Sequence, residues 1–325
     1  MVFSLLSGVN KPVNIIIKDH VIRYVELKQV SPLVIHKNGE RYLPHGLIKE
    51  GRIIDRTTLV MILEECIQEW GLKNRKVRFI VPDSFVVIRK VEVPIDIMDD
   101  EIKGFLQFEL GTSIHLPFEN SAIDFSVIGQ TTDKKSVLLF ASPEAIISEY
   151  TELLQEVKLK PVEADISPLS LYRLYFNLDL VKQDERLLFI QFDHQSVNLS
   201  IFEDYKPIFM RQVLIDSPSK LWSREDGSFM YQGEMEELML QFNDIYKEIE
   251  RVMTFYRFSL NQGKQQLTKL VVTGDHPMIT KVFKEIEDRF DIPVKPLSIH
   301  ELPLTTRMNL TNGFELAIGL ALKEV

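Results

Sequence analysis

The feature that most constrains the fold is a β-hairpin that occurs twice, about 175 residues apart. The stretch VNIIIKDHVIRYVELK predicts two short strands around an Asp19-His20 turn, and RLLFIQFDHQSVNLSIFED predicts the same around Asp193-His194. The four expected strands are Val13–Ile17, Val21–Leu27, Leu187–Phe192 and Val197–Phe202. A chain that builds one unit twice is expected to have two halves of one architecture.

Each half continues with helices and further strands, which indicates a duplicated α/β fold. Further strands are expected at Leu33–His36 (followed by a loop), 76–82, 85–94, 122–129, 135–142, Pro207–Leu214 and 267–275. Helices are expected at 55–71, 98–114, 143–159, Met235–Leu260, 277–290 and 312–325. The polar stretch 217–236 is expected to be a connection. The final helix is apolar on nearly all sides, and we expect it to be buried behind the second hairpin's sheet.

Composition excludes several classes of protein. The 325 residues carry a net charge of −9 with a pI near 5.4 and no long basic run, so we expect no nucleic-acid partner. A single cysteine, Cys66, on the inner face of an expected helix, rules out an internal disulfide and fits a reducing cytosol. No apolar run reaches the roughly 20 residues of a membrane helix. Residues 1–12 are expected to form an N-terminal tail, which is either a small free amphipathic segment or a segment docked on its own domain.

Several stretches, in order, carry a family resemblance. They are the hairpin ending in Val25-Glu26-Leu27, the Gly51-x-Ile53-x-Asp55 segment, Arg89 with Pro94, the run from Phe108 to Phe125, Asp165-x-x-Pro168-x-x-Leu171, Arg251 with Phe255-Tyr256-Arg257, and the C-terminal FELAIGLALKEV. Together they resemble the PilM family of type IV pilus assembly proteins, which belongs to the actin-like ATPase superfamily and is related to the division protein FtsA. The resemblance implies a duplicated actin-like (ribonuclease H-like) two-lobe fold. Its first lobe would span 13–180, with an inserted subdomain at about 77–142, and its second lobe 186–325.

The chain departs from the resemblance where that family holds nucleotide. Members carry glycine in both hairpin turns, because phosphate must approach backbone N–H groups closely. Here the corresponding stretches read Ile16-Ile17-Lys18 and Gln191-Phe192-Asp193, and only Gly274 is left of the adenosine turn. The connection after Leu214 is also short. Lys18, Asp19, Gln191, Asp193 and Gly274 therefore mark a degenerate cleft, in which we expect no ATP, no Mg²⁺ and no catalysis.

Asp-His pairs occur at all three expected turns, as Asp19-His20, Asp193-His194 and Asp275-His276. In an actin-like fold these turns would converge on one cleft. Imidazole and carboxylate are both metal ligands, so a metal or phosphate-like ligand is one interpretation. The other is that Asp favours turns, and exposed His is common; we expect no metal.

The resemblance also implies a partner. Relatives bind the short cytoplasmic tail of a PilN-like, single-span inner-membrane protein, beside the inserted subdomain. The residues expected to bind it are Phe85, Val87, Arg89, Phe105, Phe108 and Glu109. The predicted function is a cytoplasmic scaffold, held at the inner face of the membrane by this partner, with other pilus assembly proteins and self-association as further contacts. Two alternatives stay open: an ATP-binding, self-assembling actin homologue, and a kinase of the actin and sugar-kinase superfamily.

Overall fold

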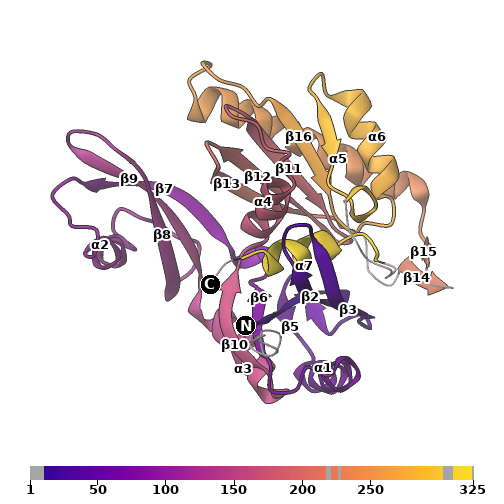
Figure 1. Cartoon of the computed structure of the whole chain (residues 1–325). Coiled ribbons are helices and arrows are strands. Elements are labelled where there is room, and N and C mark those ends of the chain that lie inside the picture. Colours follow the sequence, from indigo (N-terminus) through magenta and orange to yellow (C-terminus); the bar gives the residue numbers. More distant parts are fainter. Residues whose placement is uncertain (1–10, 217–220, 226–227, 303–309, 324–325) are drawn as a thin grey trace, which may run out of the picture.

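Two five-stranded sheets of identical topology form the body of the molecule (Figure 1). The computed structural model describes residues 11–216, 221–225, 228–302 and 310–323; most of the expected N-terminal tail lies outside them. In each sheet three antiparallel strands are followed by two parallel ones, in the orders β3-β2-β1-β6-β10 and β13-β12-β11-β16-β17. The duplication predicted from the repeated hairpin is therefore confirmed.

The first sheet is built around the first hairpin. Its strands are β1 (Val13–Lys18), β2 (Val21–Gln29), β3 (Val34–Tyr42), β6 (Lys76–Ile80) and β10 (Lys160–Asp165). Helices α1 (Arg56–Trp70) and α3 (Glu144–Glu156) pack on one face, where their apolar stripes meet Ile15, Ile17 and Phe79. Asp55 caps the start of α1, and Gly71 ends it in the left-handed conformation, at the end of the predicted helix 55–71.

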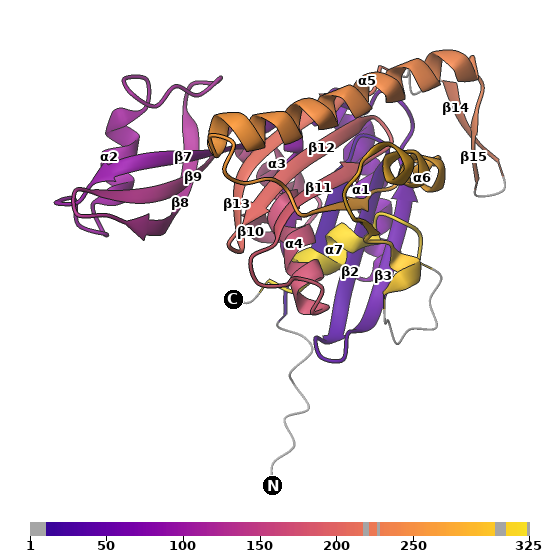
Figure 2. The same cartoon turned by 90° about the horizontal axis from the view of Figure 1, so that it is seen from above.

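The second sheet repeats this plan. Its strands are β11 (Arg186–Phe192), β12 (Ser196–Glu203), β13 (Lys206–Leu214), β16 (Lys269–Thr273) and β17 (Val294–Pro296). Helix α5 (Met235–Thr254) runs across it in Figure 2, continues as a π-helical turn (Phe255–Leu260), and lies beside α6 (Ile279–Arg289). Its apolar stripe, from Leu238 to Tyr256, is buried against the sheet.

A small three-stranded sheet projects from the first lobe to one side of the body (Figures 1 and 2). It contacts the edge strand β13 of the second large sheet, where Lys206 donates a hydrogen bond to the Ile128 carbonyl at 2.9 Å. It consists of β7 (Val87–Pro94), β8 (Ser121–Gln130) and β9 (Lys134–Pro143), with α2 (Ile102–Glu109) on one face. Because β6 pairs within the main sheet, this subdomain begins at Val87 and not near residue 77.

Two helices join the lobes. Helix α4 (Ser167–Asn177) and the C-terminal α7 (Phe314–Ala321) cross so closely that a Cβ on Gly319 would lie 2.0 Å from the Ser170 carbonyl oxygen. The expectation that α7 packs behind the second sheet was wrong. It packs against α4, β1 and β2, within a core that also takes Phe189 and Phe202 from the second sheet. Helix α7 is apolar on nearly all sides, as expected for a helix covered by both lobes, and its buried Glu315 accepts hydrogen bonds from the Ile299 and Gly313 amides.

Three local predictions also need correction. Strand β3 continues to Tyr42, through the polar segment predicted as a loop, because β2 supplies a partner along its whole length. Helix α2 is shorter than expected, and the acids predicted for its first turn precede it; Glu101 instead accepts a hydrogen bond from the Met98 amide. The connection predicted at 217–236 contains a hairpin, β14 (Trp222–Glu225) and β15 (Ser228–Tyr231).

The remaining short elements are β4 (Ile48–Lys49), β5 (Arg52–Ile53), and 3₁₀ turns at Asp83–Phe85 and Ile299–Glu301.

Candidate functional site

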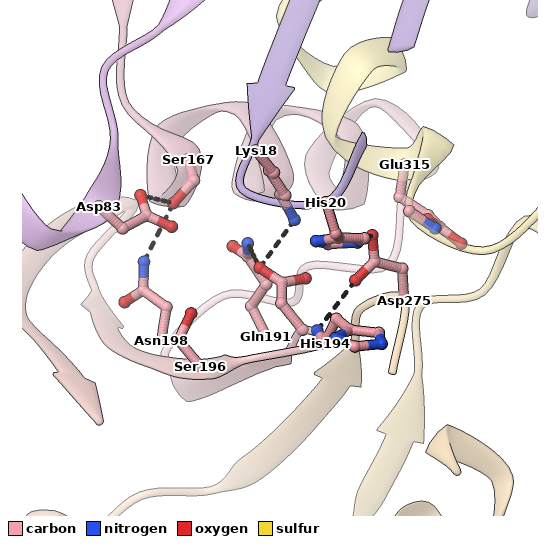
Figure 3. Close-up of polar contacts among 12 residues, drawn as sticks. Lys18, His20, Asp83, Ser167, Gln191, His194, Ser196, Asn198, Asp275 and Glu315 are labelled. Carbon is pink, nitrogen blue, oxygen red and sulfur yellow. Dashed lines mark hydrogen bonds and ion pairs between the residues drawn. The ribbon is translucent and has the colours of Figure 1, made fainter. Parts of the chain in front are cut away.

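The three Asp-His turns meet between the lobes, as the sequence predicts (Figure 3). The first follows β1, the second follows β11 and the third follows β16. The His20 and His194 rings stack with centroids 5.0 Å apart, and His194 lies 6.1 Å from the His276 ring. Residues from both lobes therefore form one cluster at the ends of the equivalent strands.

Asp275 is the centre of this cluster. Its Oδ2 lies 2.6 Å from Nη1 of Arg23 and 3.0 Å from Nε2 of His20, both from the first lobe. Its Oδ1 accepts a hydrogen bond from the His194 amide at 3.2 Å. Burial opposes the charge, but His20, Lys18 and Arg23 outweigh it and hold the pKa of Asp275 well below its usual range. Arg23, itself buried, also binds Glu40 at 2.7 Å.

The predicted cleft residues in the two hairpin turns are bound to one another or to nearby backbone. Lys18 Nζ lies 2.7 Å from Asp193 Oδ2, which also accepts a hydrogen bond from Gln191 at 2.5 Å. Burial opposes the Lys18 charge, but Asp193 and Asp275 outweigh it and raise the pKa of the ammonium. Asp19 turns away and accepts hydrogen bonds from the Glu50 and Gly51 amides at 2.6 and 3.0 Å.

Three backbone amides of the second and third turns, those of Asp193, His194 and His276, are bonded within the protein. The Asp193 amide donates to the Ser196 carbonyl at 2.9 Å, and the His276 amide donates to the Phe192 carbonyl at 3.1 Å. The His194 amide is held by Asp275. Gly274, at φ +126°, packs against the backbone of Phe192, whose carbonyl oxygen would lie 2.1 Å from a Cβ at this position. This glycine is required by the close approach of the second turn.

His194 and His276 are buried among aromatic side chains, including Phe242 and Phe229. His276 Nδ1 accepts a hydrogen bond from the Met278 amide at 3.1 Å, which fixes a neutral tautomer. Burial lowers the pKa of each imidazole to about 3, and the neighbouring His20 contributes to the shift of both. The two rings are therefore neutral packing elements at neutral pH.

Beside this cluster the lobes enclose a cavity of about 560 Å³. Asp83, which follows β6, faces it; the side chain stays partly exposed although protein surrounds the carboxyl group. Asp83 accepts a hydrogen bond from Ser167 at 2.5 Å, and Ser167 accepts one from Asn198 at 3.0 Å (Figure 3). Burial raises the pKa of Asp83 to about 6, and the charge of Asp193 adds to the shift.

The six residues predicted to bind a partner do not form one patch. Phe85 is half-buried against the first-lobe core, with the Arg52 guanidinium 4.8 Å from its ring centre, and Val87 is half-buried at the start of β7. Phe105 packs into the separate core of the subdomain. Phe108, on the outside of α2, is 78% exposed.

The two charged members of that set bind local groups. Arg89 donates to the His115 carbonyl at 2.6 Å, and Glu109 accepts a hydrogen bond from Ser113. Both contacts hold the loop that follows α2. Only Phe108 combines an apolar surface with free access to solvent.

Sequence reasoning missed Arg23 and Asp83. Arg23 lies in a strand among apolar neighbours, where an isolated charge signals a buried ion pair. Asp83 follows an apolar strand, where the carboxyl end of a parallel strand faces the interlobe crevice. Both signals were present in the sequence.

Comparison with known proteins places the chain among actin-like proteins. Its match to a chain from a solved "PilM-PilN type IV pilus biogenesis complex" covers 96% of this chain and 98% of that chain, with 18% sequence identity and a TM-score of 0.78. Its match to the ethanolamine utilization protein EutJ from Carboxydothermus hydrogenoformans covers 96% of this chain and 89% of EutJ, with 12% sequence identity and a TM-score of 0.50. A search of curated proteins finds no match.

The family model for the type IV pilus assembly protein PilM matches residues 15–215, well over half of the chain. The protein belongs to the PilM family, as the motifs predicted. Within the part of the chain that the structure describes, no helix is long and apolar enough to cross a membrane, and no three His, Cys, Asp or Glu side chains are placed to bind a metal ion.

We predict that acid destabilises the protein through His194 and His276. Their folded pKa values near 3 lie below the ordinary value of 6.5, so the unfolded chain binds more protons as the pH falls below about 6.5. Each imidazole then removes up to about 1.4 kcal/mol of stability per pH unit. Urea unfolding between pH 7.5 and 5 measures this slope.

The variant His276→Phe should flatten the pH dependence of the unfolding free energy, because phenylalanine keeps the ring and cannot bind a proton. The matched control is His36→Gln, since His36 is exposed on β3, away from this cluster, and its replacement should leave the slope unchanged. An equal slope in the wild type and His276→Phe would contradict this assignment.

Proposed function

We propose that this protein is a pilus-assembly scaffold of the PilM family that works without ATP. It lies in the cytoplasm and binds the cytoplasmic tail of a PilN-like, single-span inner-membrane protein, which holds it at the membrane. Its two lobes are joined by its own side chains where an actin-like ATPase is joined by nucleotide. It performs no hydrolysis.

The observation that carries this proposal is the closed set of ion pairs and hydrogen bonds around Asp275 and Asp193. Nucleotide binding needs free N–H groups and cationic side chains aimed at the phosphates. Here three turn amides are already bonded within the protein, and Arg23 and Lys18 are each bound to a carboxylate. A triphosphate would have to displace these contacts and approach two buried carboxylates, which is electrostatically unfavourable.

The partner follows from the family and from one exposed side chain. A solved relative was determined as a PilM-PilN complex, which supports a PilN-like tail as ligand. Tails of this kind bind through apolar anchors in pockets and by pairing with a strand edge. The projecting subdomain offers an exposed apolar side chain, Phe108, outside its small core, and two edge strands, β7 and β8.

We expect calorimetry with millimolar Mg·ATP to give no saturable heat. Three turn amides and the Lys18 and Arg23 cations are already bonded, so the gain from binding phosphate is offset by breaking Lys18–Asp193 and Arg23–Asp275. Thermal unfolding with and without Mg·ATP is the parallel measurement, since a ligand at 100 times its Kd would add about 2.7 kcal/mol. A dissociation constant in the low micromolar range would overturn the proposal of an ATP-independent scaffold.

We expect Phe108→Asp to weaken binding of the PilN-like tail at least tenfold, which is about 1.4 kcal/mol. The melting temperature should hardly change, because this ring lies outside the subdomain core. Fluorescence polarisation with the labelled N-terminal tail of the cognate membrane protein measures the affinity.

The matched control is Phe258→Asp. Phe258 is also exposed, at 56%, but lies in the π-helical turn after α5 in the second lobe. Its replacement should leave tail binding intact. Equal affinity of the wild type and Phe108→Asp would place the tail on another surface.

A further inference from the structure

The cavity between the lobes has the wrong charge for an anion. Its ionisable lining consists of five acids, two lysines and two histidines: Asp19, Glu50, Asp83, Asp193, Asp216, Lys18, Lys49, His20 and His45. Of the two ammonium groups, that of Lys18 is already bound to Asp193 at 2.7 Å. Because the excess negative charge in a low-dielectric cleft repels an anion and attracts a cation, the cavity favours a positively charged ligand.

Asp83 provides the anchoring carboxylate. Its hydrogen bonds come from neutral donors, the Ser167 hydroxyl and the Asn198 side-chain amide, and no basic side chain among the described residues forms an ion pair with it. A carboxylate surrounded by protein costs stability unless a positive group neutralises it. The partial exposure of Asp83 is directed into the cavity, so a ligand can supply that charge.

A second observation points to the same place. Asp193 is 5% exposed and lines the cavity, and its Oδ1 has no hydrogen-bond partner among the described residues. Lys18 and Gln191 both bind the other oxygen, Oδ2. The charge of Asp193 also contributes to raising the pKa of Asp83. Two neighbouring carboxylates are thus compensated by a single ammonium group.

The rest of the lining defines the shape of the ligand. Apolar side chains form much of the wall, namely Ile16, Ile17, Ile48, Ile80, Val81 and Ile215. A volume of about 560 Å³ is within the range of small-molecule sites. No set of side chains suited to a metal ion occurs within the described ranges. These properties fit a cationic head on a hydrocarbon stem.

We propose that the interlobe cavity binds an organic cation, an alkylammonium or guanidinium group on an apolar stem, with Asp83 as its principal counter-ion and Asp193 beside it. The source is either a free amine or a Lys or Arg side chain of a bound peptide, because both present the same chemistry. This proposal rests on the proposed absence of nucleotide from the cleft.

Calorimetry with agmatine tests the proposal, because agmatine carries a guanidinium and an ammonium group on a four-carbon stem. We expect saturable binding with a Kd below 1 mM, and no binding of the uncharged n-butylurea. Asp83→Asn should weaken agmatine binding at least tenfold while keeping the hydrogen bond from Ser167, since the amide oxygen accepts as well. The matched control Asp288→Asn removes an exposed acid of α6 and should not change the affinity.

A second variant covers the case in which Asp83→Asn fails to fold. Ser84 is exposed at the cavity, and Ser84→Arg should place a tethered guanidinium in the site and abolish agmatine binding. Unchanged agmatine affinity in either folded variant, or no saturable heat with the wild type at 5 mM agmatine, overturns the proposal. A Mg·ATP titration runs beside it: saturable ATP binding overturns the proposed function, whereas absent binding of both ligands overturns only the cation site.

Competition separates the two sources. If agmatine displaces the labelled PilN-like tail, and replacing the Lys and Arg residues of the tail by Gln weakens its binding, the cation belongs to the tail. If agmatine and the tail bind together, the ligand is a free amine. Either result requires Asp83, and a tail or amine that binds Asp83→Asn as tightly as the wild type contradicts the proposal.

Discussion

The ion pair between Arg23 and Asp275 is the interaction on which the arrangement of the two lobes depends. It joins β2 of the first lobe to the turn after β16 of the second, 252 residues away in sequence. Both groups are nearly excluded from solvent, so breaking the pair by removing one partner is expected to cost about 3–5 kcal/mol. Gly313 adjoins the pair: a Cβ there would lie 2.4 Å from Nη1 of Arg23. The approach of α7 and the position of the third turn are therefore set by one contact.

This contact supports our proposal that the two lobes stay closed without a shared ligand. In a two-lobe fold, interlobe contacts set the relative position of the lobes, and a ligand in the cleft supplies many of them. Here Asp275 binds Arg23, His20 and the His194 amide, while Lys18 of the first lobe forms an ion pair with Asp193 of the second. Beneath them α4 and α7 share a core with both sheets. Polar contacts fix the geometry, and the apolar core supplies most of the stability.

Much of this fold could be predicted from the sequence, because buried strands and amphipathic helices leave strong periodic patterns. The repeated hairpins, the convergence of three turns and the buried C-terminal helix were all read correctly. Strand β3 was predicted too short because its second half is an edge strand of polar, half-buried residues, whose sequence resembles a loop. Hairpin β14–β15 was missed although Asp-Gly separates its strands in the sequence, a strong hairpin signal. The Arg23–Asp275 pair could not be predicted, because it depends on how the lobes meet. The partner residues were chosen by composition, which cannot separate the buried Phe105 from the exposed Phe108.

The most direct test of this account is a double-mutant cycle between Arg23 and Asp275, measured by urea unfolding without nucleotide. The variants are Arg23→Met, Asp275→Asn and the two together. If this pair joins the lobes, each single change leaves a buried charge without its partner, and the double variant should be more stable than the two losses added together suggest. We expect a coupling above about 1 kcal/mol, within the range for residues in direct contact. Losses that add within about 0.5 kcal/mol, as for independent sites, would contradict the claim that the protein's own side chains hold its lobes together.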